Sequence, residues 1–247
     1  MKTELKTAGE YSAQIANAIR ESILTGKLTV DARLPSESDL AETFGVSRPT
    51  VREALKRLAA QNLIRTQRGA AGGAFVNRVS FDEVQSSLVT SSTLLLSMNA
   101  IDFETACEAR YALERACLPL AAERRLPTHL AAMRAEIARQ GTDGLDDQAF
   151  CASDVAFHRA LVEAAGNPIL SLHLAGAVEA MQPLMNMVTF RTRSRERIIA
   201  LHRRIADAID GRDAGAAEAA LLELASYTAQ LGGKAREQRA VRAAAIG

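Results

Sequence analysis

The chain has 247 residues, 48% hydrophobic and 24% charged, and it is rich in Ala and Leu with no Trp. This composition predicts a globular, mostly helical protein with room for one large domain or two modest ones. The three cysteines form no C-x-x-C pair and leave one unpaired, which favours free thiols in a reducing compartment over a disulfide framework. The sequence offers neither a signal peptide nor a run long enough to span a bilayer, so we expect a cytoplasmic protein.

Charge divides the chain into two parts. Residues 1–78 hold 12 Lys and Arg against 8 Asp and Glu, whereas residues 79–247 hold 18 against 21. A net of +4 in front of a net of −3 indicates two units with different partners.

The first helix is predicted over about residues 10–25. Ile15, Ile19 and Ile23 recur at a spacing of four, which places them on one helical face. A second, short helix is predicted to open at Ser36, because Asp39 follows three residues later as in a capping box.

The third helix follows almost immediately. Gly45 ends the second helix, Ser47 caps the third, and Pro49 lies in its first turn, where a missing N–H is harmless. Two β-compatible segments, 63–66 and 74–76, flank a Gly/Ala-rich turn and predict a small hairpin. Three short helices and a hairpin form a winged helix-turn-helix.

From residue 80 the pattern is helical. Breaks at Pro127, 141–144, 166–168 and 211–215 separate the expected helices. These are 81–98, 101–124, 128–140, 146–165, 168–190, 195–210 and 214–235. The final residues, from 234, lack an apolar face and are expected to fray. The fold class is therefore mainly α, with a winged helix-turn-helix followed by an all-helical antiparallel bundle.

The third helix has the features of a DNA-reading helix. Arg48 and Arg52 are four residues apart, so they share the outer face near its start. Ser47 and Thr50 add short donors suited to phosphates, and Arg68 precedes Gly69 at the hairpin tip. A basic helix alone is usually a solvated surface, but here it follows a short helix and a tight turn and precedes a basic wing.

The stretch "LPSESDLAETFGVSRPTVREALKRLAAQNLI" and the later "RGAAGGAFV" resemble the DNA-binding domain of the GntR family of bacterial transcription regulators. The resemblance covers residues 10–77 and implies a DNA-binding domain over 10–78. It implies DNA contacts by the following residues: Ser47, Arg48, Thr50, Arg52, Arg68 and Gly69. The family often carries an arginine after "PSE", and Ser38 in its place implies weaker phosphate binding.

Few polar residues stand out in the second unit. Asp154 and His158 share a helix face, His202 lies on a later helix, and Arg110 and Glu114 are four apart. Spacing alone favours an ordinary reading: a surface Asp–His pair, a solvated His202 and an exposed intrahelical ion pair. It also allows shared binding of one metal ion or one anionic ligand.

Three segments, "EARYALERACLPLAAERR", "DVAFHRALVEAAGNPIL" and "LHRRIADAIDGRDAGAAEAALLELA", are similar to the FCD effector domain of the FadR-like branch of that family. The resemblance implies an effector-binding and dimerisation domain over 80–235. It implies metal ligands at Asp154, His158 and His202, with Leu224 where a fourth histidine is usual. Such a site either holds one divalent ion (Zn, Ni or Mn) with three ligands or hydrogen-bonds an effector directly. Arg110 is then the candidate that grips the effector carboxylate.

The resemblance implies a homodimeric repressor that binds a pseudo-palindromic operator and is released by a small organic acid: a sugar acid, hydroxy acid or dicarboxylate. Two alternatives remain open from the residues. One is a metal-dependent helical enzyme using Asp154, His158 and His202, although no motif supplies a nucleophile. The other is a DNA-binding protein with no effector.

Overall fold

A computed structural model describes residues 8–69, 72–98, 100–183, 185 and 193–244. The chain divides into two compact units, Met1–Ser80 and Phe81–Gly247. None of the helices in this described part is long and apolar enough to cross a membrane.

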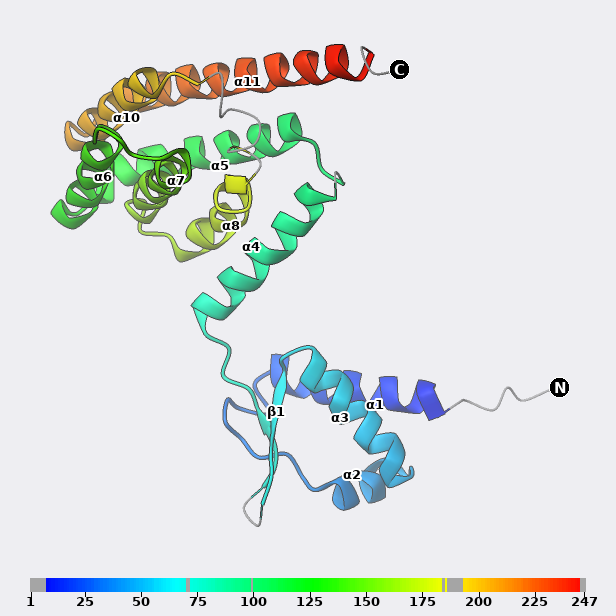
Figure 1. Ribbon diagram of the computed structural model, residues 1–247. Helices are drawn as coiled ribbons and strands as arrows, with labels where there is room; N and C mark the ends of the chain where they lie inside the picture. The colour runs from blue at the N-terminus through cyan, green and yellow to red at the C-terminus, as the bar shows by residue number, and fades with distance from the viewer. Residues whose placement is uncertain (1–7, 70–71, 99, 184, 186–192, 245–247) are drawn as a thin grey trace. The chain divides into compact units, whose positions relative to one another are not determined.

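The first unit is a winged helix-turn-helix (Figure 1). Its elements are α1 (Ala8–Leu24), α2 (Glu37–Phe44), α3 (Arg48–Ala60), β1 (Ile64–Gln67) and β2 (Gly73–Val76). The strands pair antiparallel, with Ile64 opposite Val76. Ser36 and Asp39 form the predicted capping box, and Gly45 ends α2 in the left-handed conformation with a φ of 63°. The apolar faces of α1 and α3 then close a small core.

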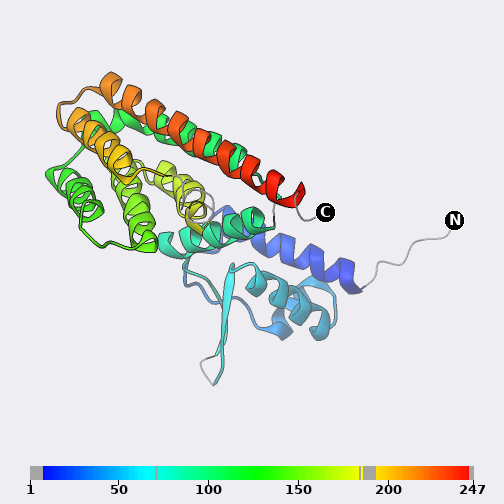
Figure 2. The ribbon, with the colours of Figure 1, turned by 45° about the horizontal axis from the view of Figure 1, so that its top comes forward.

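The second unit is helical throughout its described residues. Its helices are α4 (Phe81–Ser97), α5 (Phe103–Arg124), α6 (Pro127–Gln140), α7 (Asp147–Glu163), α8 (Pro168–Val178), α10 (Arg195–Asp210) and α11 (Ala214–Ala244). Helices α5, α10 and α11 lie side by side, and α7 packs between α6, α5 and α8 (Figure 2). Asn167 caps α8, and Pro168 is its first residue, as predicted.

Two helix ends differ from the predictions. The helix expected over 168–190 ends at Val178, and residues 186–190 lie outside the described residues. The final stretch does not fray at 234, because α11 continues through Ala244. Its Ala, Arg, Lys and Glu residues are strong helix formers, so intrinsic propensity extends the helix without an apolar stripe.

Candidate DNA interface and effector site

The start of α3 presents the predicted DNA-contacting side chains. Arg48 is its first residue, and Arg52, one turn later, is also exposed. Ser47 caps the helix: its hydroxyl accepts from the Thr50 amide at 3.4 Å and pairs with the Thr50 hydroxyl at 2.9 Å. Thr50 is only 9% exposed, so its side chain holds the cap more than it faces outward.

The guanidinium group of Arg52 is held in place by α2. Its Nε and Nη2 donate to the two carboxylate oxygens of Glu37 at 3.1 and 2.7 Å. This hydrogen bond is the main reason that the pKa of Glu37 lies below its ordinary value. Both donors of the Arg52 guanidinium are therefore occupied by the Glu37 carboxylate. Arg52 must leave Glu37 before these two donors can bind the edge of a DNA base pair.

The wing is fixed next to its turn by a residue that the sequence patterns did not indicate. Arg33 Nη2 donates to the Gly72 carbonyl at 2.6 Å, and its backbone bridges to Phe75. Gly73 has a φ of 151°, and a Cβ there would lie 2.9 Å from Arg33 Nε. Arg68 and Gly69 are exposed beside the hairpin turn, and residues 70–71 lie outside the described residues.

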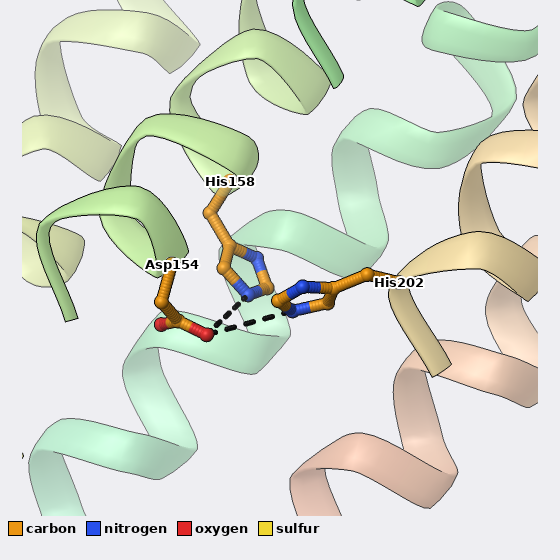
Figure 3. A group of neighbouring side chains, drawn as sticks. All are labelled: Asp154, His158 and His202. Atoms are coloured by element: carbon orange, nitrogen blue, oxygen red, sulfur yellow. Dashed lines mark ion pairs between the residues drawn. The ribbon is translucent and has the colours of Figure 1, made fainter. Parts of the chain in front are cut away.

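In the second unit, α7 and α10 bring Asp154, His158 and His202 together (Figure 3). His202 Nε2 lies 3.5 Å from Asp154 Oδ1, and His158 Nε2 lies 4.0 Å from the same oxygen. Both histidines are completely buried, and Asp154 is 15% exposed. The interpretations of His202 as solvated surface and of Asp154–His158 as a surface pair are therefore wrong.

Each imidazole is oriented by a buried partner at its other nitrogen. His158 Nδ1 lies 2.6 Å from Glu114 Oε2, and His202 Nδ1 lies 2.9 Å from Gln140 Oε1. Burial raises the pKa of Glu114, but the facing His158 and Arg110 outweigh burial and hold that pKa below its ordinary value. An ionised carboxylate only accepts, so His158 carries its proton on Nδ1, and the Gln140 oxygen assigns the same tautomer to His202.

This arrangement turns both Nε2 atoms toward Asp154 (Figure 3). Both Nε2 atoms are buried and have no hydrogen-bond partner among the described residues. Burial lowers the pKa of His202 to about 3, so its imidazole is neutral at neutral pH. The His202 ring also stacks on Phe157, with ring centroids 4.0 Å apart. A neutral imidazole held by a hydrogen bond at Nδ1, as His202 is, is the form in which histidine binds metals.

Arg110 lies beside the triad, where its main contacts are internal. It is 1% exposed, its Nε donates to Glu114 at 2.8 Å, and its Nη2 lies 3.5 Å from Asp154. The Arg110–Glu114 pair is thus fully buried and is not an ordinary surface pair worth a few tenths of a kcal/mol. Arg110 therefore contacts two carboxylates: that of Glu114, which orients His158, and that of Asp154, which belongs to the triad.

A cavity of about 20 Å³, room for about one water molecule, adjoins Asp154. Leu224 is 2% exposed and lines this cavity, so an apolar side chain occupies the place where the resemblance implies a fourth ligand. Polar side chains line the same cavity, and the sequence patterns gave no sign of them: Tyr111, Thr228 and Arg193.

The first unit is a winged helix-turn-helix, and the second is a helical bundle that buries three side chains of the kinds that bind metals or small ligands. This combination is that of a DNA-binding transcription regulator. Residues 11–76 match the family described as "Bacterial regulatory proteins, gntR family", and residues 105–226 match the "FCD domain". The chain belongs to the GntR family, in its FadR-like branch with a carboxy-terminal FCD domain.

Among curated relatives, the chain is 32% identical to the HTH-type transcriptional regulator LutR of Bacillus subtilis, over 81% of this chain and 91% of LutR. It is 29% identical to the galactonate operon transcriptional repressor of Escherichia coli, over 88% of this chain and 95% of that one. Among solved structures it is similar to a Streptococcus agalactiae GntR, with a TM-score of 0.50, 25% identity and coverage of 87% and 98%. The family and its relatives are transcription regulators, which overturns the enzyme alternative.

Proposed function

We propose that the protein is a homodimeric repressor that leaves its operator when a small organic acid binds the second unit. The observation that carries this proposal is the buried triad, in which both Nε2 atoms face Asp154 and have no hydrogen-bond partner among the described residues. Unpaired buried polar atoms are costly, and a protein that bound DNA without an effector would have no use for them.

The residues present fit a divalent metal ion. Their ligand atoms lie within 4.8 Å of one another, and the Nε2 atoms of both imidazoles face the same carboxylate oxygen. Asp154, His158 and His202 would hold the ion, and oxygen atoms of the effector or water would complete its coordination. When bound, the ion supplies a Lewis-acid anchor for the oxygens of a carboxylate. The mixed nitrogen and oxygen set suits Zn, Ni or Mn.

Arg110 then has a positioning role. Its donors are engaged by Glu114 and Asp154, so it orients the ligands and balances their charge. This interpretation replaces the expectation that Arg110 itself grips the effector carboxylate.

The names of two relatives support an acid as the effector. One is a repressor of a galactonate operon, and another is a putative regulator of an L-lactate dehydrogenase operon, both from Escherichia coli. Galactonate and lactate are both hydroxy acids. By analogy with these relatives, we expect the effector of this chain to be a carboxylate with at least one hydroxyl.

The small cavity explains how such an acid could act as a switch. An acid larger than a water molecule must widen the cavity, so the bound and free bundles differ. A ligand shifts an equilibrium only if it binds the two states unequally, and this widening provides the inequality. In a dimer, the change would alter the spacing of the two α3 helices on operator half-sites.

A mobility-shift titration on DNA upstream of the gene tests the proposal. The protein is loaded with zinc, and lactate, galactonate and succinate are added in turn. We expect a shifted dimer complex that one acid dissolves, and loss of zinc and of the acid response in His158→Ala. A response unaffected by removal of the metal would contradict the metal anchor. DNA binding that no acid changes would favour the effector-independent alternative.

A further inference from the structure

The cavity beside Asp154 has a second polar side. Three side chains line it and are here called the distal wall: Tyr111 from α5, Thr228 from α11, and Arg193 from the segment just before α10. Tyr111 is 8% exposed, Thr228 is 3% exposed, and the side chain of Arg193 is 3% exposed. Buried polar groups that share a cavity with a ligand site set the pattern of donors and acceptors that a ligand must match.

The direction of the Tyr111–Thr228 hydrogen bond follows from counting protons. The Thr228 hydroxyl donates its one proton to the Leu224 carbonyl at 3.0 Å. The Tyr111 oxygen lies 2.8 Å from Thr228 Oγ1, so Tyr111 is the donor in that contact. A phenol has one proton and can also accept. No other partner of this hydroxyl is recorded in the described chain, so Tyr111 offers an acceptor to the cavity.

Arg193 contributes the matching donor. Its Nη1 contacts Cys151 Sγ, and its Nη2 pairs with Asp147. Its Nε is buried and has no partner in the described part of the chain. The guanidinium therefore retains at least this N–H for a ligand oxygen.

An unfilled donor beside an unfilled acceptor matches a hydroxyl group, which accepts one hydrogen bond and donates another. We propose that the distal wall selects an effector with a hydroxyl group remote from the metal-bound carboxylate, so that Arg193 donates to that hydroxyl and Tyr111 accepts its proton. This inference rests on the proposed function and narrows its effector from organic acids in general to polyhydroxy acids.

A second carboxylate fits the wall less well. It could accept from Arg193, but it has no proton for Tyr111, whose oxygen would face another acceptor. The charge of Arg193 is already paired with Asp147. Arg195 also pairs with Asp147, so the two arginines carry one positive charge more than the aspartate balances. Because Arg195 is 29% exposed, solvent screens that extra charge. The distal wall should therefore discriminate against dicarboxylates.

Three acids that differ at one carbon test this selection. Glycerate carries CH2OH where lactate carries CH3 and tartronate carries a carboxylate. Isothermal titration calorimetry of the zinc-loaded full chain gives a Kd for each acid and for its four-carbon homologue. We expect the acid with the distal hydroxyl to bind roughly ten- to a hundredfold more tightly than the methyl acid, because the methyl leaves two buried polar atoms unpaired.

Two variants change the wall in opposite ways. Tyr111→Phe removes the acceptor, so the preference for glycerate over lactate should fall about tenfold while lactate affinity stays the same. Thr228→Val removes the group that takes the Tyr111 proton, so Tyr111 becomes a donor to the cavity. Thr228→Val should therefore shift the preference from glycerate toward tartronate. Zinc content and far-UV circular dichroism confirm that each variant is folded and loaded.

The outcomes separate this inference from the proposed function. If lactate or tartronate binds as tightly as glycerate at both chain lengths, or if Tyr111→Phe leaves the ratios unchanged, the distal wall does not select a hydroxyl. The metal and acid switch would still stand in that case. If none of the six acids binds the zinc-loaded protein, the acid effector itself is refuted and this inference falls with it.

Discussion

The replacement Glu114→Gln tests how the effector site is held together. Glu114 is completely buried, and its two oxygens contact Arg110 Nε at 2.8 Å and His158 Nδ1 at 2.6 Å. Glutamine keeps the shape but removes the charge and one acceptor, so the only remaining ion pair of the buried Arg110 among the described residues is with Asp154 at 3.5 Å. Breaking a buried ion pair costs about 3–5 kcal/mol, and one retained hydrogen bond reduces our expectation to about 2–4 kcal/mol.

Differential scanning calorimetry is the suitable assay, because two units can unfold separately and the chain has no Trp. Only the transition of the second unit should move. The matched control is Glu218→Gln, since Glu218 pairs with Arg115 at 2.7 Å through side chains 40% and 58% exposed. That pair is worth less than about 1 kcal/mol. Equal shifts for both variants would refute the assignment of Glu114 as the buried anchor of Arg110 and His158.

Three further predictions concern the metal and the DNA. Leu224→His should raise zinc affinity about tenfold or more by adding a fourth ligand, measured by competition with a chelator, and unchanged affinity would place residue 224 out of reach of the ion. Arg52→Ala should weaken operator binding by about 1–3 kcal/mol in fluorescence anisotropy, and equal weakening on random DNA would exclude base contact. Glu37→Gln should tighten DNA binding several-fold by releasing Arg52, beyond the effect of Glu53→Gln, which removes the same charge from α3.

The sequence predicted what local spacing determines. The Ser36 capping box, the Asn167 cap and the shared face of Asp154 and His158 all follow from residues within four positions of one another. Such contacts follow from helix geometry alone and need no knowledge of the tertiary fold.

The parts that escaped prediction involve residues distant in sequence. Glu114 is 44 residues from His158, Gln140 is 62 from His202, and Tyr111 is 117 from Thr228. Nothing in the pattern of α5 shows that Glu114 faces an imidazole, because its neighbour Arg110 already offers a satisfactory partner within the helix. Helix packing decides which of these contacts form.

The unpartnered nitrogens of His158 and His202 connect stability to function. A buried polar atom without a hydrogen bond costs about 1–3 kcal/mol, and an ion bound by both Nε2 atoms would remove that cost. Loading the site should then stabilise the second unit, by about 2.7 kcal/mol at a hundred times the Kd. In the proposed function, an effector acid would add to this by widening the cavity between Asp154 and the distal wall, and a ligand that favours the widened state shifts the bundle toward it.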